Sequence, residues 1–173
     1  MPMFHHHQWI PIAATALTLG VPAPAHRHVS ASPATSLIGT WRLVRRTQRL
    51  LDGTTREHPV AVGYLIYTDV HRMCYVAMDP ERAPWVSPVR PTPDEAVRTV
   101  DGLQAYCSRV EVNEAAGYVL HHIEIEKAPN LVGHDRKRWF TFVTSDELHL
   151  RIDRSEVQPP VVDDELVWAR VSE

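Results

Sequence analysis

The chain has 173 residues, of which 44% are hydrophobic and 23% charged, and its formal net charge is −3. This length allows one sizeable hydrophobic core, and the composition is that of a globular protein rather than a disordered one. The basic residues are scattered along the sequence, whereas a nucleic-acid-binding protein usually concentrates them on one face. We therefore expect a single globular domain that does not bind nucleic acid.

The first 25 residues have features of a secretory signal peptide. Arg27 is the first charged residue, the run 10–21 is mostly apolar but too short to span a membrane, and Ala23-Pro24-Ala25 resembles a cleavage site. No Lys or Arg precedes the apolar run, so an uncleaved N-terminal extension is the alternative. We expect a linker over 26–36, no membrane span, and a periplasmic or secreted protein if the segment is a signal peptide, or a cytoplasmic one otherwise.

From residue 37 to 173 the sequence is typical of a β-rich domain. Eight segments rich in β-branched and aromatic residues are separated by turn signals such as Asp52-Gly53. These predicted strands are 42–51, 63–68, 72–78, 106–112, 118–126, 136–143, 148–153 and 165–171. Closure into a barrel removes the exposed edges of such a meander. We predict an all-β fold, an antiparallel barrel of eight or more strands.

One helix interrupts the strands. The segment 79–93 is rich in proline and cannot be regular structure. At the end of this segment, Thr92-Pro93-Asp94-Glu95 is typical of a helix start, with Thr92 as N-cap and Glu95 completing a capping box. Apolar residues follow at helical spacing, so we predict a short helix over 93–104. We expect this helix and the proline-rich segment to cover the open mouth of the barrel, with Trp85 touching the ligand.

The two cysteines, Cys74 and Cys107, both lie in predicted strands, and their spacing matches neither a metal site nor a CxxC motif. We interpret them as two small buried hydrophobic residues, as free cysteines often are. A disulfide bond between them is the alternative, and it requires an oxidising compartment. We expect no metal site and no cofactor.

A set of short motifs occurs in order along the chain, and the first of them contains Gly39-Thr40-Trp41. They are 37–44, 63–68 with Arg72-Met73, 119–124, 129–133, 138–140, 148–150 and 166–171. Together they resemble the bacterial lipocalin-like domain family, within the calycin group of ligand-binding barrels. The resemblance implies a barrel with a cavity but no named reaction, because the function of that family is largely uncharacterised.

The resemblance also implies that Arg170 covers Trp41 and closes one end of the barrel. A desolvated cation–π contact of this kind contributes about 1–2 kcal/mol. His71 and Cys107-Ser108 depart from the family pattern, which more often has small residues or glycine at these positions.

Strand alternation indicates which side chains face the cavity. On 118–126 the inward face is the apolar one, and we expect it to hold Val119, His121, Ile123 and Ile125, with His122, Glu124 and Glu126 outside. On 136–143 we expect Arg138, Phe140 and Phe142 inside, Trp139 outside and Arg136 solvated. A buried guanidinium needs a carboxylate, a carbonyl, an aromatic face or an anionic ligand.

These faces lead to three functional hypotheses. The first is binding of a small hydrophobic or amphipathic molecule, with ligand contacts from Tyr64, Met73, Tyr75, Trp85, Tyr106, His121, Arg138 and Phe140. The second is a cofactor-independent isomerase or cyclase, in which His121 is the general acid or base and Arg138 stabilises an enolate or carboxylate. The third is haem binding with His121 as axial ligand. The sequence favours the first.

Overall fold

The computed structural model describes residues 32–57, 62–69 and 71–172, all within the compact unit Ala31–Glu173. The segment expected to be a signal peptide, 1–25, lies outside these residues. Within the described residues the chain forms a nine-stranded antiparallel sheet. Its strands are β1 (Gly39–Leu50), β2 (Thr55–Glu57), β3 (Val62–Tyr67), β4 (Arg72–Met78), β5 (Leu103–Asn113), β6 (Tyr118–Glu126), β7 (Asp135–Thr144), β8 (Glu147–Ile152) and β9 (Val161–Arg170).

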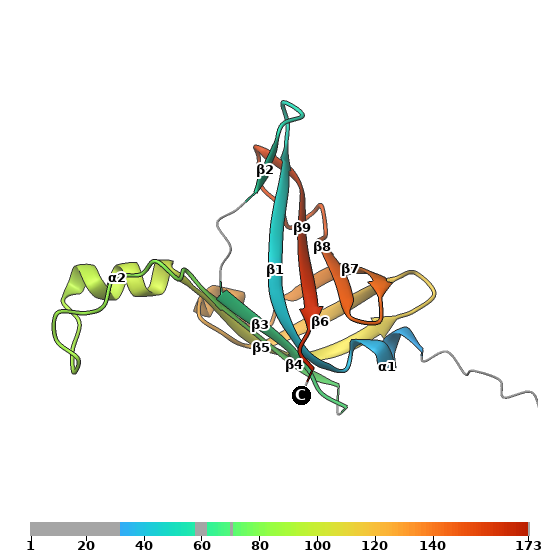
Figure 1. Ribbon diagram of the computed structural model, residues 1–173, viewed down its shortest axis with the longest axis horizontal. Helices are drawn as coiled ribbons and strands as arrows, with labels where there is room; N and C mark the ends of the chain where they lie inside the picture. Colours follow the sequence, from blue (N-terminus) through green and yellow to red (C-terminus); the bar gives the residue numbers. More distant parts are fainter. Residues whose placement is uncertain (1–31, 58–61, 70, 173) are drawn as a thin grey trace, which may run out of the picture. The chain divides into compact units, whose positions relative to one another are not determined.

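The sheet closes into a barrel, as the sequence predicted. Each strand pairs with the next in the order β1-β3-β4-β5-β6-β7-β8-β9, and β9 pairs back with β1. Figure 1 shows β1 and β9 running side by side. The short strand β2 pairs with the far part of β1 and was not predicted, because its three residues are all exposed and carry no alternation.

The helix α1 (Pro33–Leu37) helps to close one end of the barrel. Ser32 caps it, and Leu37 is buried and accepts a 2.8 Å hydrogen bond from Trp41 Nε1. The guanidinium of Arg170 lies 4.1 Å from the centre of the Trp41 ring, as the resemblance implied. Its N–H groups donate to three backbone carbonyls, those of Ser36, Ile38 and Ser145. Residues 33–36 were expected to belong to a linker, and that prediction is wrong because they form part of α1.

Two β-bulges reverse the alternation of β1 and β6. On β1 the register shifts between Leu43 and Arg45, after which Arg46 and Gln48 face the interior. On β6, Ile123 and Ile125 pair with consecutive residues of β5, so one residue of β6 is extra. An extra residue moves every later side chain to the opposite face.

The bulge on β6 corrects our prediction for the end of that strand. Ile125, expected inside, is 66% exposed. The side chain of Glu126, expected in solvent, is 1% exposed. Strict alternation failed here because it presumes an unbroken ladder of strand pairs.

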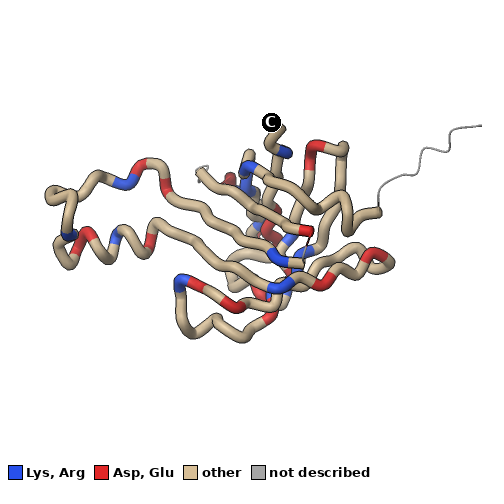
Figure 2. Tube along the Cα trace, turned by 90° about the horizontal axis from the view of Figure 1, so that it is seen from below, with Lys and Arg blue, Asp and Glu red and all other residues tan. Residues whose placement is uncertain are grey.

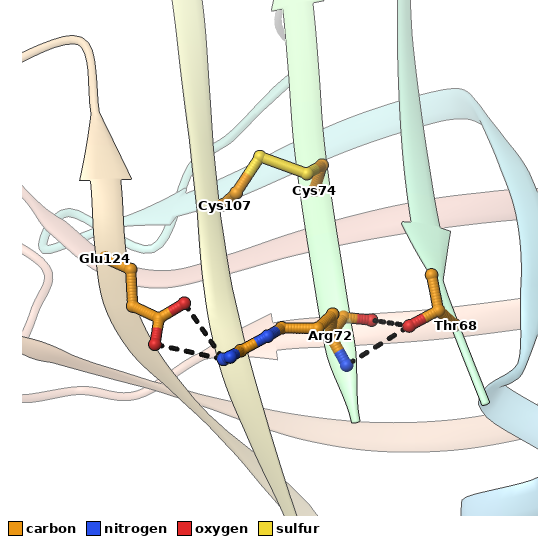
Figure 3. The surroundings of a disulfide bond; sticks show 5 residues. All are labelled: Thr68, Arg72, Cys74, Cys107 and Glu124. Atoms are coloured by element: carbon orange, nitrogen blue, oxygen red, sulfur yellow. Dashed lines mark hydrogen bonds and ion pairs between the residues drawn. A yellow bond between two sulfur atoms is a disulfide. The ribbon is translucent and has the colours of Figure 1, made fainter. Parts of the chain in front are cut away.

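Cys74 and Cys107 form a disulfide, which corrects their interpretation as free buried residues. They lie directly opposite each other on β4 and β5, with 4.1 Å between their Cα atoms. Their neighbours Met73 and Tyr106 are buried inside the barrel, so alternation places the disulfide on its outer face. Figure 3 shows the bond near the ion pair between Arg72 and Glu124.

The helix α2 (Pro93–Asp101) begins at the predicted capping box and ends before β5. It does not cover the barrel mouth, and this expectation is wrong. Its main packing contact is with β5, and in Figure 1 it extends away from the barrel beyond β4 and β5. Trp85 Nε1 donates to Thr99 Oγ1 of α2 at 2.9 Å, so the proline-rich segment packs on the helix instead.

Acidic and basic residues both occur along the part of the chain that the structure describes. In Figure 2 acidic and basic positions are interspersed along the trace, including the part that holds α2. Among the residues that the structure describes, no helix is long and apolar enough to cross a membrane.

Candidate functional site

A pocket of about 470 Å³ occupies the barrel interior, and each of the eight barrel strands contributes to its wall. The apolar part consists of Leu65, Leu131, Leu150, Ile152, Leu166 and Trp168. The polar part consists of Arg46, Tyr75, Gln104, Tyr106, His121, His134, Asp135, Arg136, Arg138 and Glu156. Mostly apolar walls with a few fixed polar groups are typical of small-molecule sites.

His121 lies in the pocket wall between two tyrosines. It is fully buried, with its Nε2 2.8 Å from the Tyr67 hydroxyl and its Nδ1 3.0 Å from the Tyr106 hydroxyl. Burial, and then the positive charges of Arg138 and Arg136, hold the pKa of His121 well below its ordinary value of 6.5. The ring is therefore neutral, so it donates to one hydroxyl and accepts from the other. The sequence pattern favoured Tyr64 of the same segment, but Leu65 and Tyr67 share the buried face of β3.

Arg138 lies in the same wall and is 8% exposed. Its Nη1 donates to Glu156 Oε2 at 2.8 Å and to the Lys137 carbonyl at 2.7 Å. Glu156 belongs to the connection between β8 and β9, and its Oε1 accepts from the Lys137 backbone N–H at 2.6 Å. The partner that a buried guanidinium requires is thus a carboxylate.

Two further arginines line the pocket, Arg46 on β1 after its bulge and Arg136 on β7. Arg46 makes a bidentate pair with Asp164 at 2.9 and 2.6 Å, and Asp164 is 2% exposed. Arg136 lies 2.9 Å from Glu126 and 4.5 Å from the centre of the Tyr106 ring. The expectation that Arg136 is solvated is wrong, because the bulge on β6 brings Glu126 inside to pair with it.

The predicted ligand-binding residues divide into two groups. Tyr75, Tyr106, His121 and Arg138 line the pocket. Met73 and Phe140 pack in the hydrophobic core but are not part of the pocket wall. Tyr64 is 45% exposed because its neighbour Leu65 takes the inward position on β3, and Trp85 lines a separate groove beside α2.

His122 and Trp139, which were expected outside the barrel, are found there. His122 Nδ1 lies 2.7 Å from Asp135 Oδ1, and Trp139 Nε1 donates to Asp153 at 2.9 Å. Within the described part of the chain, no cluster of three or more His, Cys, Asp and Glu residues is arranged to hold a metal ion.

A closed antiparallel barrel of eight strands around an interior pocket is the architecture of the lipocalin-like class. The sequence model of the family described as "Lipocalin-like domain" matches residues 38–171, and the chain belongs to this family. Among solved structures, a redesigned β-barrel shares 14% identity with a TM-score of 0.41, over 82% of this chain and 100% of its own. The comparison with curated proteins found no match.

Proposed function

We propose that this protein binds a small amphipathic molecule inside the barrel. The observation that carries the proposal is the pocket wall, in which apolar residues such as Leu65, Leu150 and Trp168 lie beside polar groups anchored by other residues. Side chains held by hydrogen bonds and ion pairs are already ordered, so a ligand orders few additional groups when it binds. The lipocalin-like family supports binding of small hydrophobic molecules in general.

The surroundings of His121 favour binding over the isomerase or cyclase chemistry. A general base needs a free lone pair within reach of the proton that it removes. Both ring nitrogens of His121 instead engage tyrosine hydroxyls. The same two bonds argue against an axial haem ligand, because haem iron would have to displace one of them.

A fluorescence titration tests this proposal. N-phenyl-1-naphthylamine is a neutral apolar dye whose emission rises when it leaves water, and we expect saturable binding to the purified protein. Leu131 lies at the pocket and is 37% exposed, so Leu131→Trp adds bulk there without disturbing the core. This variant should bind the dye several-fold more weakly.

Val132→Trp is the matched control. Val132 follows Leu131 in the same turn, is 47% exposed, and is not part of the pocket wall. It should bind the dye like the unaltered protein. The absence of saturable binding, or an equal loss in both variants, would contradict the proposal.

A further inference from the structure

We propose that the pocket recognises an organic acid, with its carboxylate or sulfonate group held by the unused donors of Arg138 and Tyr75. This inference rests on the proposed function and specifies the ligand class. It follows from which donors and acceptors of the pocket are already engaged.

The unused donors are found on two inward residues. Arg138 is bonded through Nη1 alone, and no hydrogen bond joins its Nε or Nη2 to another described residue. The Tyr75 hydroxyl likewise has no hydrogen bond to the described residues. None of these three atoms is among the buried side-chain atoms that lack a partner, so each is open to the space of the pocket.

The carboxylates beside Arg46 and Arg138 are engaged. The oxygens of Asp164 accept from Arg46 and Gln48. Those of Glu156 accept from Arg138 and from the Lys137 backbone. A donor group of a ligand would therefore find these two carboxylates already paired, whereas an oxygen-bearing acceptor group beside Arg138 and Tyr75 meets free N–H and O–H groups.

The charges of the pocket wall favour an anion over a neutral acceptor. Arg46, Arg136 and Arg138 line the pocket together with two carboxylates, Asp135 and Glu156, whereas Asp164 and Glu126, the partners of Arg46 and Arg136, do not line it, so the wall carries one more positive than negative group. The positive charges of these three arginines each favour the ionised form of Tyr75, so all three act on its hydroxyl. The free Nε and Nη2 of Arg138 form the planar fork that matches the two oxygens of a carboxylate.

Burial supports the role of Tyr75 as a donor. It raises the pKa of this phenol to about 12, so the hydroxyl keeps its proton at neutral pH. The aliphatic part of the wall, including Leu65 and Leu150, then holds the apolar body of the acid.

Two dyes with the same skeleton test the inference. 8-Anilinonaphthalene-1-sulfonate is N-phenyl-1-naphthylamine with an added sulfonate, so the ratio of their affinities measures the contribution of the anionic group. Because a hydrogen bond to a charged group contributes about 1.5–3 kcal/mol, we expect the sulfonate dye to bind about tenfold more tightly or better. If neither dye binds, the proposed function itself fails. If the neutral dye binds and the sulfonate dye binds no better, only the present inference fails.

Two variants test which residues cause the preference for the sulfonate dye. Tyr75→Phe removes the hydroxyl and keeps the ring, and Arg138→Lys keeps the charge beside Glu156 but removes the fork. Each should lower the affinity ratio several-fold. Tyr64→Phe is the matched control, because Tyr64 lies on the outer face of the neighbouring strand β3, and its ratio should equal that of the unaltered protein. An unchanged ratio in both pocket variants would overturn the assignment.

Discussion

Two arginines, Arg170 at the closed end of the barrel and Arg138 in the pocket wall, differ in how many of their nitrogens the protein itself engages. Arg170 covers Trp41, and its Nε, Nη1 and Nη2 all donate to backbone carbonyls. Arg138 uses only Nη1 for the protein and leaves its other donors open to the pocket. All three nitrogens of the first guanidinium are engaged by the backbone, whereas two nitrogens of the second have no hydrogen bond to the described residues. We therefore interpret the closed end as a structural element and the pocket as the site of the proposed binding.

The largest effect is expected at the closed end. Trp41 is fully buried, so Trp41→Ala should lower the free energy of unfolding by about 3–5 kcal/mol, as other large aromatic truncations in cores do. Urea denaturation followed by circular dichroism measures the change. Trp85→Ala, beside α2 and 39% exposed, is the control and should change stability little. A Trp41→Ala protein as stable as its parent would contradict the structural role of this end.

A smaller loss is expected from the ion pairs at the pocket. Asp164→Asn keeps the shape of a buried side chain but removes the charge that pairs with Arg46. Because the Arg46 side chain is 34% exposed and so retains some hydration, we expect a loss of about 2 kcal/mol rather than the larger cost of a fully buried pair.

Asp163→Asn tests whether the loss is specific to the interior. Asp163 is the neighbouring residue on β9 and lies 3.9 Å from the exposed Arg151, so this variant should unfold at nearly the same urea concentration as its parent. Equal losses of stability from both substitutions would mean that the pair of Arg46 and Asp164 stabilises the protein no more than an exposed ion pair does.

The smallest effect is a pH dependence arising from His121. Burial holds its folded pKa below 6.5, so beneath that pH the unfolded chain takes up a proton that the folded chain does not. The contribution of the neutral His121 ring to the free energy of unfolding is therefore present above pH 6.5 and is lost as the pH falls. Between about pH 7.5 and about pH 5.5 this loss amounts to about 1.4 kcal/mol.

Substitution of single histidines isolates this contribution in unfolding experiments at both pH values. His121→Gln, whose amide both donates and accepts, should lack this part of the pH dependence. His122→Gln, on the outer face, should retain it. If His121→Gln kept the full dependence, His121 would not be neutral in the folded protein.

The contact between Trp41 and Arg170 at the closed end was predictable, because alternation runs unbroken through Trp41 and Leu43 and because the resemblance implied Arg170, but α1 was not predicted. The same pattern placed His121 and Arg138 correctly. Among the strands of the described residues, only the short strand β2 was not predicted.

The charged part of the pocket was not predictable in the same way. Arg46 and Glu126 each follow a bulge, and a single extra residue leaves no trace in a hydrophobic pattern such as Ile123-Glu124-Ile125-Glu126. The partner of Arg138 lies in a loop outside any strand, and nothing in its local sequence indicates the contact.

The central claim, that the barrel binds a small amphipathic molecule, is tested most directly by finding a natural ligand. The unaltered protein, Leu131→Trp and Val132→Trp would each be exposed to a metabolite extract, separated by gel filtration, and examined by mass spectrometry for retained small molecules. We expect the unaltered protein and Val132→Trp to retain the same small molecule and Leu131→Trp to retain much less of it. Retention of nothing by any of the three, or equal retention by all, would contradict a binding role for the pocket.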